Sequence, residues 1–156
     1  TVVTPKIDVA PGGGVAATVE PSGEAVPAPS AATAHHAEDA ARSGVTLATQ
    51  HAGYTGTGYA DYANASGDHV EWTVPVAAGG PHRVGIRYAN GGTADRPLQI
   101  SVNGTAAGTI PFAPTGGWAA WRTAEVTVTL PAGAAVRIRA TSTGASGANL
   151  DCLILD

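Results

Sequence analysis

From Thr33 onward, apolar and polar residues alternate along most of the chain. Short runs in which every second residue is apolar occur at 70–76, 84–88, 98–102, 126–130 and 136–139. A period of two with one polar face predicts antiparallel strands. Asn103-Gly104 separates two such runs and favours a tight hairpin. No window keeps a helical period, although residues 38–42 allow one helical turn. The pattern predicts an all-β, antiparallel β-sandwich of the jelly-roll kind.

The first 32 residues have a different character. They hold five prolines, a run of three glycines at 12–14 and many alanines. This composition is typical of a linker or of the end of a preceding module. One short apolar run, at 15–19, is long enough for an edge strand. We therefore expect a linker at 1–32 and one folded domain at 33–156.

Composition and charge narrow the class of protein. Only 13% of the residues are charged, the net charge is -4, and 44% are hydrophobic. A nucleic-acid binder would need a basic patch, so nucleic acid is not the expected partner. The sequence has no run of about 20 apolar residues, so it predicts no membrane-spanning helix. Cys152 is the only cysteine and has no disulfide partner within the chain. A surface poor in charge suits a secreted, extracellular domain, and we expect the sequence to be a piece of a longer secreted chain.

Two loops carry candidate binding groups. The first, at 53–62, is rich in glycine and presents Tyr54, and a strand pattern follows it. Phosphate binding would need a helix N-terminus there, so a nucleotide is disfavoured. The second runs from Arg87 through Asn90 to Arg96. Its side chains suit a polyhydroxylated ligand or a carboxylate, but the same residue types also build turns, and both readings stay open.

Two tryptophans lie three residues apart in a glycine-rich connection, at Trp118 and Trp121. An indole presents a flat apolar face that can stack on a sugar ring, but aromatic side chains also fill cores. Residues three apart in an extended segment point to opposite faces. We expect Trp118 at the loop tip and Trp121 inside.

Two carboxylates lie near the two ends of the predicted domain, at Glu38 and Asp151. Calcium takes about six to eight oxygen ligands, and carboxylates with backbone carbonyls supply them. The sequence alone does not bring the two residues together, and two solvated carboxylates are the plainer interpretation.

Taken together, several segments resemble family 35 carbohydrate-binding modules, a group related to families 6 and 36. The resemblance covers about residues 34–156. Its carriers are His36-Ala37-Glu38-Asp39-Ala40, the 53–62 run, Gly67-Asp68-His69-Val70-Glu71-Trp72, Arg87-Tyr88-Ala89-Asn90-Gly91, Val102-Asn103-Gly104, Gly117-Trp118 with Trp121, and Asn149-Leu150-Asp151. The resemblance implies a non-catalytic, calcium-binding sandwich appended to a secreted enzyme that acts on polysaccharides.

The resemblance also implies roles for single residues. Glu38 and Asp151 match the ligands of a structural calcium, with help from carbonyls near Ser43. His36 stands where the family often has a second glutamate, and we expect it, with Ser43, among the residues of this metal site.

The residues that match the family's sugar-binding loops are Tyr54, Asn90, Trp118 and Asn149, and either Arg87 or Arg96 is placed to pair with a sugar carboxylate. Several family members bind terminal uronic acids with a second calcium in the cleft. We therefore expect a terminal glucuronic or unsaturated galacturonic acid at a polysaccharide chain end, bound by a monomeric module of a multidomain enzyme. Neutral sugars such as galactose, mannan or glucan units are the alternative.

Two rivals remain. An enzyme that cleaves sugars would normally use two carboxylates. Asp61, Asp68, Glu71 and Asp95 are available, but no pattern singles them out. A metal site at His35 and His36 is disfavoured, because neighbours on a strand point to opposite faces. A structural sandwich without a ligand would instead bury both Trp118 and Tyr54.

Overall fold

The computed structural model describes residues 33–62, 66–144 and 147–156. The predicted linker at 1–32 and its apolar run at 15–19 lie outside these residues, so both stay predictions. Residues Thr33–Asp156 form one compact unit. Within the described residues, no helix is long and apolar enough to cross a membrane.

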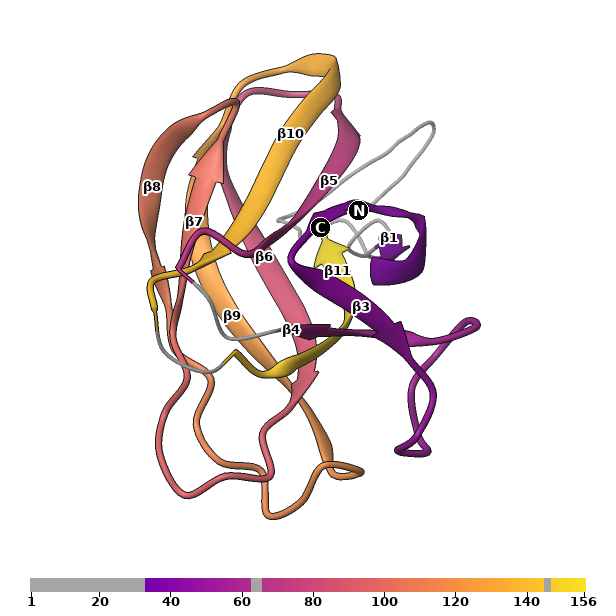
Figure 1. Ribbon diagram of the computed structural model, residues 1–156. Coiled ribbons are helices and arrows are strands. Elements are labelled where there is room, and N and C mark those ends of the chain that lie inside the picture. The colour runs from indigo at the N-terminus through magenta and orange to yellow at the C-terminus, as the bar shows by residue number, and fades with distance from the viewer. Residues whose placement is uncertain (1–32, 63–65, 145–146) are drawn as a thin grey trace, which may run out of the picture. The chain divides into compact units, whose positions relative to one another are not determined.

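Two antiparallel sheets build the described part of the chain, which confirms the predicted all-β sandwich (Figure 1). One sheet has the order β3-β4-β11-β6-β9, with β1 also paired to β11, and the other has the order β2-β5-β10-β7-β8. The strands are β1 (Thr33–His36), β2 (Ala41–Ser43), β3 (Val45–Ala48), β4 (Tyr59–Tyr62), β5 (His69–Val76), β6 (Gly80–Ala89), β7 (Leu98–Val102), β8 (Thr105–Ile110), β9 (Trp121–Leu130), β10 (Gly133–Ser142) and β11 (Asn149–Leu155).

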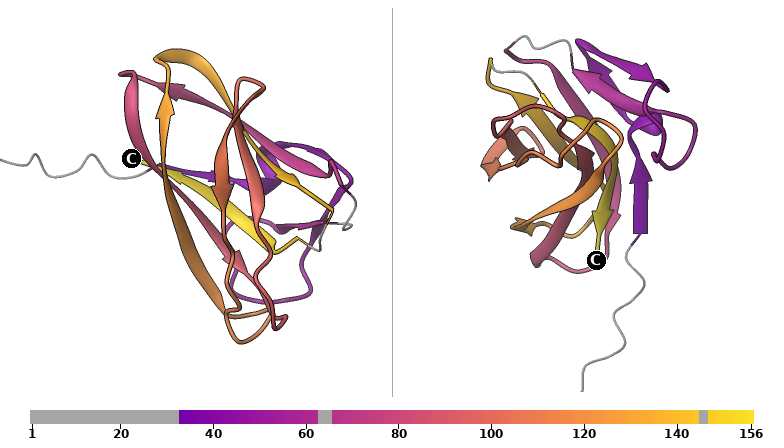
Figure 2. Two further views of the ribbon diagram at one scale, coloured as in Figure 1. Left: turned by 90° about the vertical axis from the view of Figure 1, so that its left-hand side faces the viewer. Right: turned by 90° about the horizontal axis from the view of Figure 1, so that it is seen from below.

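The core lies between the two sheets, which pack as layers (Figure 2). The predicted alternation is what fills it. On β5, every second residue from Val70 to Val76 is buried, while the residues between them are at least partly exposed. Val84 and Ile86 of β6 approach the same core from the opposite sheet. Burying each such side chain contributes about 1.5–3 kcal/mol, so the period-two pattern decides which face of each strand points inward.

The predicted hairpin joins β7 to β8. Val102 pairs with Thr105, which leaves Asn103 and Gly104 as a two-residue turn. Their φ angles are 50° and 88°, so both adopt the left-handed conformation. A turn of this kind favours asparagine and glycine and matches the twist of the flanking strands.

Two local features position the carboxylates at the ends of the domain. A short 3₁₀ helix, η1 (Ala37–Asp39), carries the chain from β1 in one sheet to β2 in the other and places Glu38 between them. The helical turn allowed at 38–42 is therefore shorter, because Ala41 already pairs with Glu71 of β5. A β-bulge in β11 falls at Asp151, since Leu150 and Cys152 pair with consecutive residues of β6.

Candidate functional site

Three of the predicted sugar-binding residues line one cleft. Arg96, Trp118 and Asn149 come from the loop before β7, the loop before β9 and the first residue of β11. The cleft has a volume of about 220 Å³. Its full lining is His51, Asp61, Tyr62, Arg96, Trp118, Gly147 and Asn149. The cleft therefore combines one indole with a guanidinium, a carboxylate and uncharged hydrogen-bonding groups.

The Trp118 indole is half-buried and is held by its neighbours. The guanidinium carbon of Arg96 lies 4.9 Å from the ring centroid, a cation–π arrangement. Gly91 packs so closely on the indole that an added Cβ would lie 2.5 Å from its Cδ1 atom. The His51 ring centroid lies 6.4 Å away on the cleft side. Trp118 thus has a fixed orientation in the cleft.

Arg96 has a second anchor beside the cleft. Its Nη1 atom donates a 3.1 Å hydrogen bond to the carbonyl oxygen of Gly147. The arginine therefore connects the loop before β7 to the residues that precede β11. Its guanidinium thus lies over the Trp118 ring and lines the cleft.

Asn90 has a different environment from the one its residue type suggested. It is fully buried and does not line the cleft. Its Nδ2 atom donates to the carbonyl oxygens of Ala94 (2.9 Å) and Phe112 (2.8 Å), and its Oδ1 accepts from the Gly92 amide (3.0 Å). In this structure the side chain shapes the loop that carries Gly91 and Arg96.

Tyr54 lies in an aromatic cluster next to the cleft. Its ring centroid is 5.6 Å from that of Tyr59, which is fully buried. Trp121 contacts the same tyrosine edge-on at 5.4 Å and donates from Nε1 to the carbonyl oxygen of Ala52 (2.9 Å). The prediction that Trp121 lies inside is therefore wrong. Its side chain is half-buried on the outer face, where the 49–58 loop covers it.

Glu38 and Asp151 lie 113 positions apart in the sequence (151 − 38), but both contact the same turn, at Thr55–Thr57. Asp151 accepts from the amide and the hydroxyl of Thr55, at 2.8 and 2.9 Å. Glu38 Oε2 accepts from the amide of Thr57 at 2.6 Å. Between them, Gly56 has a φ of 69°, and an added Cβ would lie 1.9 Å from Glu38 Oε2. The two carboxylates are thus not independent solvated groups.

This carboxylate site (Glu38, Asp151, Thr55 and Thr57) has a donor set that fits calcium in one specific respect. Glu38 Oε1 is buried and has no hydrogen-bond partner among the described residues. A hard cation prefers such oxygens. No group of three or more His, Cys, Asp and Glu side chains in the described part of the chain could hold a metal ion, so hydroxyl, carbonyl or water oxygens would have to complete the shell.

Three other residues, predicted to bind the metal or a sugar carboxylate, lie in different surroundings. His36 Nδ1 lies 3.3 Å from the Thr55 hydroxyl, beside the carboxylate site. Ser43 is in β2, where it pairs with His69 of β5 in the same sheet. Arg87 contacts a carboxylate of the protein itself, because its Nη1 atom lies 2.6 Å from Asp151 Oδ2.

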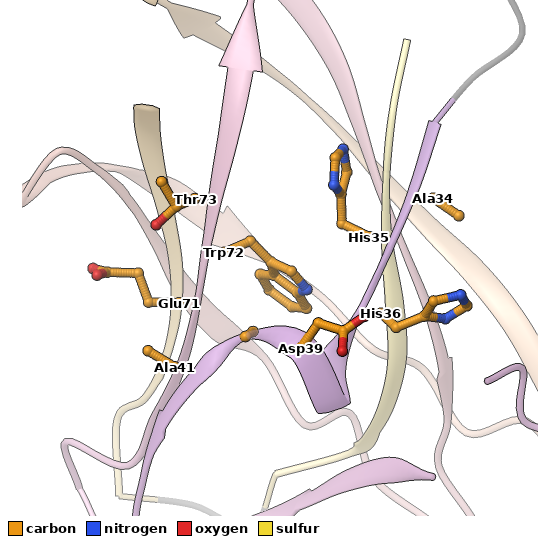
Figure 3. A pocket seen from close by; sticks show the side chains of 9 residues that line it. Ala34, His35, His36, Asp39, Ala41, Glu71, Trp72 and Thr73 are labelled. Carbon is orange, nitrogen blue, oxygen red and sulfur yellow. The ribbon is translucent and has the colours of Figure 1, made fainter. Parts of the chain in front are cut away.

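A second cavity, of about 240 Å³, lies between β1, η1 and β5 (Figure 3). His35 and His36 both border it, but their rings point in different directions. Burial, followed by the neighbouring His36, lowers the pKa of His35. Glu71 at the rim is paired with Arg139 at 2.9 Å. The different ring directions disfavour a two-histidine metal site here, and Glu71 is paired within the protein.

Sequence reasoning missed His51 and Asp61 as cleft residues. His51 comes just before the glycine-rich run at 53–62, and Asp61 lies near the end of that run, on β4. Their positions at the two ends of that run were the available signal. Cys152 behaves as a buried apolar residue, and burial raises the pKa of its thiol to about 11.

The sandwich fold and a small polar cleft with one indole suit a sugar-binding module. A model of the family "carbohydrate binding module (family 6)" matches residues 36–156, and the chain belongs to this family. The resemblance to family 35 modules is also confirmed. The native structure of a family 35 carbohydrate-binding module from Clostridium thermocellum superposes with a TM-score of 0.77 at 38% identity, covering 81% of this chain and 98% of that one.

Two further matches bear on function. A family 35 module solved in complex with a glucuronic acid containing disaccharide has a TM-score of 0.71 at 33% identity, over 79% of this chain and 91% of that one. An exo-β-D-glucosaminidase of Amycolatopsis orientalis is 47% identical over 131 residues, which are 83% of this chain but only 13% of the enzyme. The chain is therefore a binding module, and its homologues are parts of glycoside-active enzymes.

Proposed function

We propose that this module binds a terminal uronic acid, glucuronic or unsaturated galacturonic acid, at the end of a polysaccharide chain. The observation that carries the proposal is the convergence of Arg96, Trp118 and Asn149 on one cleft. Its volume of about 220 Å³ is below the roughly 300–1,000 Å³ of pockets for drug-sized ligands. That size favours one sugar ring, and therefore a chain end.

The cleft residues suit distinct parts of a uronic acid. The Trp118 indole offers an apolar surface for the C–H face of the ring. Arg96 presents a planar fork of donors that matches a carboxylate. Asn149 and His51 can each exchange hydrogen bonds with ring hydroxyls. Asn90 and Tyr54 act from behind the cleft, by holding the loops that present these groups.

Calcium is part of the same proposal, at two places. Glu38 and Asp151 would hold a structural ion, which would neutralise the two carboxylates that fasten the Thr55–Thr57 turn. That ion would share Asp151 with the Arg87 guanidinium. In the cleft, Asp61 and Asn149 provide oxygens for a second ion next to a sugar carboxylate.

A neutral sugar is the second candidate, and Asp61 is the observation that favours it. Without a cation, the Asp61 carboxylate in the cleft would repel a uronate. Galactose, mannan or glucan units lack that charge. The dependence of binding on calcium therefore distinguishes the two candidates.

The setting we propose is a monomeric module of an extracellular, multidomain polysaccharide-degrading enzyme. A small cleft supports only modest affinity, with dissociation constants of about 1 µM to 1 mM. Its benefit to a parent enzyme would come from tethering, which raises the local concentration of substrate.

The decisive experiment is calorimetric titration of the module with glucuronic acid, galactose and mannose, each in calcium and then in chelator. We expect heat with glucuronic acid in calcium, and none with a folded Trp118→Ala variant. Arg96→Gln should weaken binding of the uronate more than binding of any neutral sugar. Arg83→Gln is the matched control, because Arg83 is exposed on β6, away from the cleft.

The alternatives give different results. Heat with galactose or mannose that chelator leaves unchanged would replace the uronate by a neutral sugar and remove the cleft calcium. Unchanged affinity in folded Trp118→Ala would place the binding site elsewhere. No heat with any sugar would favour a purely structural sandwich.

A further inference from the structure

The buried carboxylate of Asp151 already has a positively charged partner within the protein. Its side chain is fully buried, and Arg87 Nη1 lies 2.6 Å from its Oδ2 atom. The same Nη1 donates to the carbonyl oxygen of Gly53 at 2.8 Å. Taking a carboxylate out of water is costly unless a cation and hydrogen bonds accompany it. Arg87 supplies the cation, and Thr55 supplies two hydrogen bonds.

Arg87 is itself held in this position. It projects from the outer face of β6, and its guanidinium carbon lies 5.4 Å from the centroid of the Trp121 ring. Trp121 in turn bonds the carbonyl oxygen of Ala52, one residue before the carbonyl that Arg87 binds. The guanidinium is thus fixed between an indole, a carboxylate and the 49–58 loop.

The two carboxylates of the site differ in this respect. Both Asp151 oxygens accept hydrogen bonds, whereas Glu38 Oε1 has no partner among the described residues. A divalent cation that bound both carboxylates would come close to the guanidinium. Two like charges at one carboxylate repel each other strongly in a partly buried place.

We infer that Arg87 is the resident cation of Asp151, that it fastens the 49–58 loop without a metal, and that calcium and Arg87 compete for the same carboxylate. The inference rests on the proposed function only in naming calcium as the competitor. It makes Arg87 a positioning residue for the sugar-binding loops, not a contact to the sugar. It also predicts that removing the guanidinium opens a stronger cation site.

The test is the melting temperature of the module in calcium and in chelator, for the wild-type protein, Arg87→Gln and Arg87→Lys. We expect calcium to raise the melting temperature of the wild type and of Arg87→Lys only slightly, because each keeps a cation beside Asp151 that competes with the metal. Arg87→Gln should melt lower in chelator and regain about 5 °C or more in calcium. Calcium titration by calorimetry should show affinity about tenfold higher in Arg87→Gln than in the wild type.

Two results would overturn the inference. One is a calcium-induced rise in the wild type as large as that in Arg87→Gln, since Arg87 would then not compete. The other is a destabilised Arg87→Gln that calcium does not rescue, since no cation site would have opened. If Arg87→Gln fails to fold, the wild-type melts and calcium titration of Arg87→Lys still decide the first point. Sugar titration of the wild type is independent, so failure of the uronate proposal would be visible separately.

Discussion

Two loops flank the cleft, and they are anchored in opposite ways. The 49–58 loop is fastened by side chains of distant elements, chiefly Asp151, Glu38 and Arg87. The 90–97 loop is fastened largely by its own side chains, with Asn90 bonding Ala94 and Gly92. The first should therefore respond to a cation bound at Glu38 and Asp151, and the second should not. The difference shows that loops which present one site can have separate sensitivities.

The largest expected effect is on the loop that is anchored from outside. Asp151→Ala would leave Arg87 without its carboxylate and Thr55 without two acceptors. Breaking a buried pair in this way costs about 3–5 kcal/mol, and the partial exposure of Arg87 places the value toward the lower end. Urea unfolding measures it. Glu125→Ala is the control, since Glu125 forms an exposed pair and should change stability by less than about 1 kcal/mol. Equal effects would remove the special role of Asp151.

The next effect concerns the self-anchored loop. Asn90→Ala would leave the carbonyl oxygens of Ala94 and Phe112 without their donor in a buried place. We expect a loss of about 2–3 kcal/mol, the same in calcium and in chelator. Gln99→Ala, an exposed change on β7, is the control. Calcium dependence of the loss in the Asn90 variant would contradict the separation of the two loops.

A smaller effect on stability, with a clear effect on binding, is expected at Gly91. Gly91→Ala would place a Cβ 2.5 Å from Trp118 Cδ1, so the indole must move. Sugar affinity should fall while the domain stays folded, as measured by calorimetry and circular dichroism. Gly117→Ala is a matched control in the neighbouring loop, because its Cβ would meet no atom within 4 Å. Full affinity in Gly91→Ala would mean that the present indole orientation is not needed.

The smallest effect is a pH dependence outside both loops. The pKa of His35 is lowered, first by burial and then by His36. The unfolded chain therefore takes up this proton at a higher pH than the folded chain. Stability from this group is present above a pH of about 6.5 and declines as the pH falls toward the folded pKa. Urea unfolding between pH 7.5 and 5 should show a shallower decline in His35→Gln; an identical slope would contradict it.

The core of the fold could be predicted from the sequence because its signal is local. Apolar residues such as Val70 and Val74 on β5, and Ile86 on β6, follow a period of two that predicts the buried face of each strand. Asn103-Gly104 predicts where the chain reverses. The short strands near the start are harder, because β2 and β3 hold only three and four residues. Their pairing depends on partners far along the chain.

The site was predictable only in part, for the same reason. Trp118 drew attention by residue type and Asn149 by the resemblance to family 35 modules, and the two do share a cleft. By contrast, Asn90 is of a residue type that often binds ligands, but its side chain is buried and hydrogen-bonds to the backbone. Trp121 points outward because it pairs with Ala89 on the neighbouring strand β6. The spacing of the two tryptophans along the chain does not reveal this pairing.

The pairing of β1 with β11 also determines where the two ends of the folded domain lie. Thr33 pairs with Leu155, so the points where the folded domain is entered and left are adjacent. Asn149, at the cleft, begins the same strand that Leu155 ends. Six residue steps at roughly 3.3 Å each separate them, or about 20 Å. Both ends of the folded domain thus lie at the end of β11 opposite the cleft, so the domain joins any longer chain at one side only.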